Sequence, residues 1–140
     1  MPMKKGIPCC TLNVGCTSFA PIDATTYYMG GIHAITAQTT ADRCRVYTPL
    51  IGVIRKVLIF MHSSTTTGTN ESWTMLLRLN NTTDYTIAAV ATNENTRLWA
   101  NYDLNIPVKI GDYFEIKTTC PTWVTNPDGC RMCGTIVIEG

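Results

Sequence analysis

The sequence is poor in charge, in histidine and in long apolar runs. Charged residues make up 15% of the 140 residues and the formal net charge is +1, so the chain lacks the basic field that holds nucleic acid or anionic lipid. The longest apolar runs have five residues, as in Val57–Met61, well under the roughly 20 residues that span a bilayer. No apolar core of signal-peptide length follows the N-terminus. We therefore expect neither a nucleic-acid partner nor a membrane partner.

Catalytic and helical patterns are missing as well. The two histidines are His33 and His62, and the sequence shows no Ser–His–Asp or paired-carboxylate motif, so it offers no candidate site for acid–base or nucleophilic catalysis. We expect the acidic residues to lie in turns or in solvent; they include Asp42, Glu94, Asp103, Asp112 and Glu115. No segment of ten or more residues has a helical period with caps. The chain is therefore predicted to be non-enzymatic and all-β.

What the sequence does contain is the alternation typical of β-strands. In Ile106–Thr118, apolar and polar residues alternate on both sides of a tight turn at Gly111–Asp112, as in strands with one buried face. Glu115 falls on the side opposite Phe114 and Ile116, which is the predicted solvent side. Similar runs, separated by turn clusters such as Asn80-Asn81, predict strands at 27–36, 43–48, 52–61, 72–80, 83–90, 96–102, 106–118 and 134–139. About eight short strands at this spacing indicate a β-sandwich or a barrel.

The first 26 residues lack a steady alternation. Pro2, Pro8 and Pro21 interrupt them, and proline fixes φ and removes a backbone donor. We therefore expect an extended N-terminal arm at 1–26 and a β domain at 27–140. Such an arm is suited to lie on another protein chain.

Several elements of the β domain follow a characteristic order. They are Tyr28 and Gly30-Gly31, Pro49 leading into Gly52–Val57, the strand Ser72–Asn80, the corner Pro107–Asp112 and the closing strand Gly134–Glu139. In this order residues 27–140 resemble the tumour necrosis factor-like jelly rolls of tailed-phage structural proteins, with Asn81 where glycine is common. The resemblance implies an antiparallel jelly-roll β-sandwich and a homotrimer. It also implies a place on the virion as head decoration, head fibre or tail-fibre tip, and it does not imply an enzyme.

Cysteine is the most unusual feature of the composition, with seven residues: Cys9, Cys10, Cys16, Cys44, Cys120, Cys130 and Cys133. Cys130 and Cys133 have the spacing of a zinc-ligand pair, and the first three cysteines could supply the remaining ligands. The same residues could instead form disulfides between the arm and the last strand, within or between subunits. Several could also be buried free thiols. All three alternatives remain open, and structural zinc is the only cofactor that the residues suggest.

Trp123 is the best candidate for a surface contact. It follows Cys120-Pro121 in a segment rich in turn residues, where an exposed ring could bind a glycan or pack against a neighbouring subunit. Together with the polar segments 63–70 and 92–96, it would define a glycan-binding end of the sandwich.

Two functions follow from these observations. The first is a non-enzymatic virion protein, made in the host cytoplasm: a trimeric capsid decoration or cement protein on a phage head. It would bind the major capsid protein or another virion protein through residues 1–26. The alternative is a fibre-tip or adhesin module for host attachment through a glycan, although 26 residues cannot build the shaft that a fibre needs.

Overall fold

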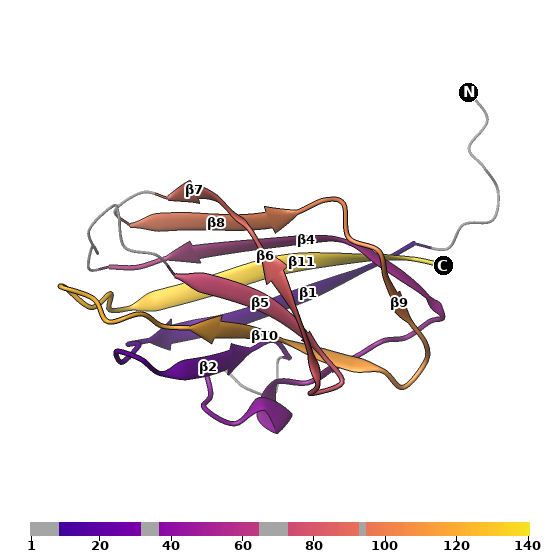
Figure 1. Ribbon diagram of the computed structural model, residues 1–140, viewed down its shortest axis with the longest axis horizontal. Helices are drawn as coiled ribbons and strands as arrows, with labels where there is room; N and C mark the ends of the chain where they lie inside the picture. The colour runs from indigo at the N-terminus through magenta and orange to yellow at the C-terminus, as the bar shows by residue number, and fades with distance from the viewer. Residues whose placement is uncertain (1–8, 32–36, 65–72, 93–94) are drawn as a thin grey trace.

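The computed structural model describes residues 9–31, 37–64, 73–92 and 95–140. These residues form strands and one short 3₁₀ helix, η1 (Ala41–Cys44) (Figure 1). The strands are β1 (Cys9–Phe19), β2 (Thr26–Met29), β3 (Val46–Tyr47), β4 (Gly52–His62), β5 (Thr74–Leu79), β6 (Thr83–Ile87), β7 (Ala89–Thr92), β8 (Thr96–Asn101), β9 (Ile106–Val108), β10 (Tyr113–Thr119) and β11 (Cys130–Glu139).

The strands build two antiparallel sheets. Sheet A has the order β1-β11-β4-β8-β7, with β9 paired to β4, and sheet B has the order β2-β10-β5-β6, with β3 paired to β10. Each of these pairs is antiparallel, and Figure 1 shows β1, β11, β4 and β8 running side by side. The predicted all-β class and the predicted antiparallel sandwich are confirmed.

The strand pairing is nested along the chain. β1 pairs with β11, β2 with β10, β4 with β8, and β5 with β6. The innermost pair is closed by a tight turn at Asn80 and Asn81, whose φ angles are +50° and +57°. Asparagine tolerates this left-handed region better than most residues, which is why such a pair closes hairpins. The turn predicted at these two residues is confirmed.

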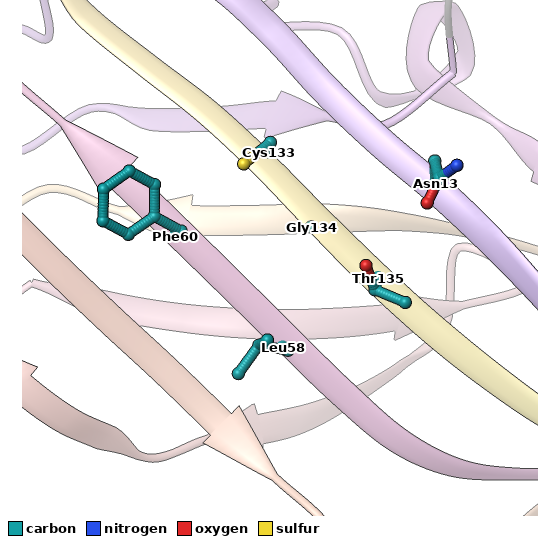
Figure 2. A pocket seen from close by; sticks show the side chains of 6 residues that line it. All are labelled: Asn13, Leu58, Phe60, Cys133, Gly134 and Thr135. Atoms are coloured by element: carbon teal, nitrogen blue, oxygen red, sulfur yellow. The ribbon is translucent and has the colours of Figure 1, made fainter.

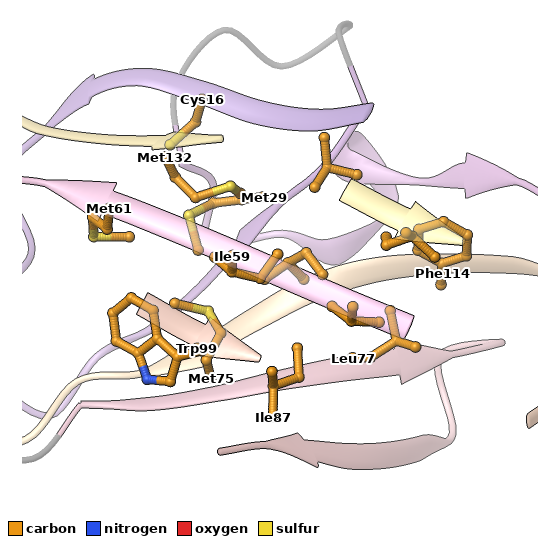
Figure 3. Close-up of a cluster of buried hydrophobic side chains, with 14 of the residues drawn as sticks. Cys16, Met29, Ile59, Met61, Met75, Leu77, Ile87, Trp99, Phe114 and Met132 are labelled. Atoms are coloured by element: carbon orange, nitrogen blue, oxygen red, sulfur yellow. The ribbon is translucent and has the colours of Figure 1, made fainter. Parts of the chain in front are cut away.

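Alternate residues of both sheets meet in one apolar core (Figure 3). Trp99 and Phe114 are 1% and 0% exposed, and full burial of such a side chain stabilises the fold by about 1.5–3 kcal/mol. Methionine fills irregular gaps between sheets well because its side chain is flexible. Four methionines take this role, namely Met29, Met61, Met75 and Met132.

The expected arm is wrong for residues 9–19, which form β1 at the edge of sheet A. Along this strand the even-numbered residues turn toward the core, and Val14 and Cys16 are buried. The alternation was missed because two of its apolar positions are cysteines, which were considered as ligands rather than as small apolar residues. Residues 1–8 lie outside the described part of the chain.

Two predicted strands are each divided between the sheets. Segment 83–90 becomes β6 in sheet B and β7 in sheet A, with the break at Ala88, whose carbonyl accepts a hydrogen bond from the Ala100 amide. Segment 106–118 becomes β9 in sheet A and β10 in sheet B. The predicted turn at Gly111–Asp112 is present, with Gly111 at φ +94°. It joins two sheets rather than two paired strands, which alternation alone does not reveal.

Other boundaries shift as well. Arg43 and Cys44, predicted in a strand, belong to η1, and only Val46–Tyr47 pairs with β10. The last strand begins at Cys130 rather than at residue 134. The predicted strand 27–36 is described as β2 up to Met29, and residues 32–36 lie outside the described part of the chain.

Candidate interaction surface

The outer surface of sheet A is uncharged at its centre. The register places Asn13 beside Thr135 and Leu58, while Cys133 lies beside Phe60 in the next row. Phe60 is 40% exposed, which is unusual for phenylalanine at the centre of a sheet. Lys56 lies toward one end of this surface, and His62 and Arg131 lie at the other, all exposed. We call the uncharged centre the sheet A face.

A groove of about 290 Å³ crosses the sheet A face (Figure 2). Its lining comes from three neighbouring strands: Asn13 of β1, Cys133, Gly134 and Thr135 of β11, and Leu58 and Phe60 of β4. Apart from the thiol of Cys133, this lining contains no acidic or basic side chain. An apolar side chain of another molecule would therefore enter the groove without desolvating a charge.

The five cysteines of the zinc and disulfide interpretations do not gather in one cluster, although Cys16 and Cys130 lie near enough to interact electrostatically. Cys130 is buried and Cys133 is exposed, because residues three apart on a strand point to opposite faces. Cys9 is paired with Glu139, at the far end of β11 from Cys133, and six residues along a strand span about 20 Å. Across the described residues, no group of three His, Cys, Asp or Glu side chains could hold a metal ion.

Within the chain the seven cysteines are free thiols, as the third alternative expected of several of them, while a disulfide between subunits stays a prediction. All seven are unpaired with one another, and four of them are buried: Cys16, Cys44, Cys120 and Cys130. Burial raises the pKa of Cys16 and Cys44 to about 11 and that of Cys120 and Cys130 to about 12. At neutral pH these thiols are protonated and therefore unreactive.

Trp123 is not a surface contact. It is 5% exposed, and its ring packs edge-on against Trp73 with 5.2 Å between ring centroids. Trp73 in turn contacts Trp99, whose indole N–H donates to the backbone oxygen of Trp73 at 2.9 Å. The prediction failed because the turn residues around Trp123 suggested exposure, whereas three distant tryptophans meet at this end of the sandwich. The neighbouring Val124 is the exposed residue, at 96%.

The other predicted contacts are only partly described. His62 is exposed beside the sheet A face. Most of the polar segments proposed for glycan binding lie outside the described residues, namely residues 65–70 and 93–94, which include Glu94. His33 lies outside them as well.

The outer surface of sheet B differs from that of sheet A because it carries charge. Asp84 accepts hydrogen bonds from Arg78 at 3.0 Å and from Lys117 at 2.7 Å. The guanidinium of Arg45 lies 4.2 Å from the centroid of the Tyr113 ring, a cation–π contact. Glu115 lies among these groups and is 0% exposed, so the expectation that it faces solvent is wrong.

Comparisons of the chain with protein-family models, with curated proteins and with solved structures find no match. Within the described residues, no helix has the length and apolar character needed to cross a membrane. The fold and surfaces define the class of protein as a two-sheet antiparallel β-sandwich, with one outer surface uncharged at its centre and the other carrying charge.

Proposed function

We propose that this chain is a non-enzymatic structural protein of a virion, a trimeric jelly roll of the tumour necrosis factor-like type that decorates or cements a phage head. The nested pairing supports the jelly roll. A long hairpin rolled into two sheets produces this succession of partners: β1 with β11, β2 with β10, β4 with β8, and β5 with β6.

The sheet A face is the observation that carries the proposed assembly. It combines an exposed Phe60 with an uncharged groove of about 290 Å³. Depletion of charge at the centre and an aromatic anchor are the features that distinguish the core of a protein interface from ordinary surface. In the trimer this face packs against a neighbouring subunit, and the charged residues at its two ends form the rim.

The contact with the capsid uses the N-terminal part of the chain. β1 is the last strand in the order of sheet A and pairs with β11 on one side, while on its other side Gly15 bridges Gly30 of sheet B. An edge strand presents unpaired N–H and C=O groups, to which a strand of another protein can add. The role first assigned to an extended arm, binding the major capsid protein or another virion protein, is therefore assigned to the β1 edge.

The glycan-binding alternative loses Trp123 as a contact, because the ring is buried. Most of its polar segments 63–70 and 92–96 lie outside the described residues, so it stays a prediction.

The assembly is tested by native mass spectrometry of the purified protein. The wild type is expected to be a trimer, and Phe60→Glu is expected to be a folded monomer, because the substitution places a charge in the proposed interface. Ile110→Glu is the matched control, since Ile110 is 67% exposed and lies in the turn after β9, away from the sheet A face; it should remain trimeric. A wild-type monomer at high concentration, or a trimeric Phe60→Glu variant, contradicts the proposed interface.

The location is tested separately by electron cryomicroscopy of particles assembled with and without the protein. The proposal expects surface density on the head to disappear when the protein is omitted, and to return when purified protein is added back. Heads with unchanged density would exclude the decoration role, whatever the oligomeric state in solution.

A further inference from the structure

Glu115 lies at the point of β10 where the neighbouring strand on one edge changes from β3 to β2. Along one edge of β10, residues 116–119 pair with β2 and residues 113–114 pair with β3. Glu115 falls between the two ladders. On the opposite edge it pairs with Arg78 of β5. Cys44, in the segment that connects β2 to β3, lies close enough to Glu115 for the two groups to interact electrostatically.

The described part of that connection, residues 37–47, lies over the gap, and we call it the cover segment. The Gly31 amide donates to the Cys44 oxygen at 3.1 Å, and the backbones of Tyr28 and Gln38 exchange hydrogen bonds of 2.6 and 2.9 Å. A Cβ on Gly30 would lie 2.6 Å from the Cys44 oxygen, so the cover rests directly on the end of β2. Under it, Cys44 is 0% exposed and its thiol donates to the Tyr28 oxygen.

The carboxyl of Glu115 beneath the cover accepts no hydrogen bond at either oxygen within the described part of the chain, and the Nε of Arg45 also lacks a partner among these residues. An ionised carboxylate in such a place is strongly unfavourable unless it is paired. Burial, partly offset by the nearby charges of Arg45 and Arg78, raises the pKa of Glu115 to about 7.

The surrounding charges do not provide a pair in this arrangement. Arg78 and Lys117 are bound to Asp84, and Arg45 lies on the Tyr113 ring. The titratable and charged groups on this surface are Asp42, Cys44, Arg45 and Tyr47 from the cover segment, Tyr28 from β2, Arg78 from β5, Asp84 from β6, and Tyr113 and Lys117 from β10.

We propose that the cover segment is a pH-sensitive lid: it is closed while Glu115 is protonated, and it opens when rising pH ionises the carboxyl. Opening releases the proton to solvent, hydrates the carboxylate and exposes Cys44. Opening can stop short of unfolding the sandwich, because few described backbone bonds hold the cover to sheet B: those of the two-residue β3, the Tyr28–Gln38 bridge and the Gly31 amide. Ala37 and Val46, near its two ends, also pack against the core, so the part that opens is the stretch between them.

The lid is tested with the protein's own thiols. Labelling by 4,4′-dithiodipyridine is followed at each cysteine by peptide mass spectrometry between pH 5 and pH 8, and each rate is divided by the rate for the urea-unfolded chain at the same pH. The pKa of Glu115 is about 7 when the lid is closed and 4.5 when the carboxyl is hydrated. The equilibrium constant for lid opening should therefore rise by up to about 70-fold between pH 5 and pH 8. Cys44 protection should fall accordingly, while Cys16 and Cys130 in the core stay protected.

Glu115→Gln should remove the pH dependence at Cys44, because the amide does not ionise. Glu139→Gln is the matched control: Glu139 is a half-exposed carboxylate of sheet A, paired with Arg55, and its loss should leave the Cys44 profile unchanged. If Glu115→Gln does not fold, hydrogen exchange of the wild-type cover segment against β11, corrected for the intrinsic rate, carries the same test.

Two results would overturn the proposal. Constant Cys44 protection from pH 5 to pH 8 would mean that the ionised carboxylate stays covered, for example because Arg45 leaves Tyr113 and pairs with it. Equal loss of protection at Cys44, Cys16 and Cys130 would mean that the whole sandwich unfolds rather than the cover.

Discussion

Gly134 provides a quantitative test of how the three strands β1, β11 and β4 pack. A Cβ added to Gly134 would lie 2.5 Å from Cδ1 of Ile59, 2.9 Å from Cγ2 of Val14 and 2.9 Å from the Leu58 oxygen. Ordinary contacts of this kind are about 3.5–4.0 Å, so the end of Ile59 must move by about 1 Å. Overpacking of this size costs about 1–3 kcal/mol. We expect Gly134→Ala to lower the free energy of unfolding by about that amount.

A second substitution separates the steric cause from a general effect of alanine. Ile59→Val removes the Cδ1 atom and alone costs about 0.5–1.5 kcal/mol. In the double variant part of the clash is relieved, so the two costs should sum to more than the measured loss, with a coupling of about 1 kcal/mol. The relief is incomplete because the Leu58 oxygen belongs to the backbone and cannot move aside.

The assay is urea unfolding followed by tryptophan fluorescence at one protein concentration, with the slope of the transition compared between variants. Thr135→Val is the control, since the neighbouring side chain lines the outer groove and the change should stay within about 0.5 kcal/mol. A loss below about 0.5 kcal/mol for Gly134→Ala, or strict additivity with Ile59→Val, would show that Ile59 and Val14 do not approach Gly134 as described.

Two further predictions concern the tryptophan cluster and the turn before β10. Trp99→Phe removes the N–H that donates to the Trp73 oxygen at 2.9 Å and leaves a cavity, so urea unfolding should show a loss of about 3 kcal/mol; a loss under about 1 kcal/mol would contradict the buried hydrogen bond. Hydrogen bonds from the Lys109 amide, and then from Asn80, hold the pKa of Asp112 below its usual value. The ionised side chain therefore stabilises the fold above the ordinary carboxyl pKa, and this stabilisation is lost as the pH falls through the pKa of Asp112 in the folded protein. Asp112→Asn should therefore be less stable than wild type at pH 7, with a gap that narrows in acid, and a gap independent of pH in acid unfolding curves would contradict this.

Local pattern was enough to predict β4, β5, β8 and the turn at Asn80–Asn81, because each depends on alternation or on turn chemistry within a few residues. It failed for β1, where Cys10 and Cys16 occupy apolar positions of the alternation. It failed again at Ala88, where a continuous β-like run passes from one sheet to the other. Whether a strand continues or crosses depends on its partners, which are distant in sequence.

The candidate surfaces were less predictable than the strands. Phe60 and Cys133 lie side by side although they are far apart in the chain, and no local signal marks that proximity. Trp123 was predicted to be exposed from its turn-rich neighbours, and the ring is buried by Trp73. The Cys-x-x-Cys spacing suggested that the two thiols bind one zinc ion. On a strand, however, this spacing places the two thiols on opposite faces.

The sequence by itself determined the β class, the two-faced strands and several of the turns, because those follow from side-chain periodicity and backbone preference over short distances. Only the tertiary structure decided which outer surface is uncharged at its centre, which thiols are buried and how Glu115 came to be covered. The covering has a plain physical cause: β10 exchanges one neighbour for another at that residue, and the connecting segment lies over the gap. Burial of that kind depends on a contact between segments far apart in the chain, which periodicity does not encode.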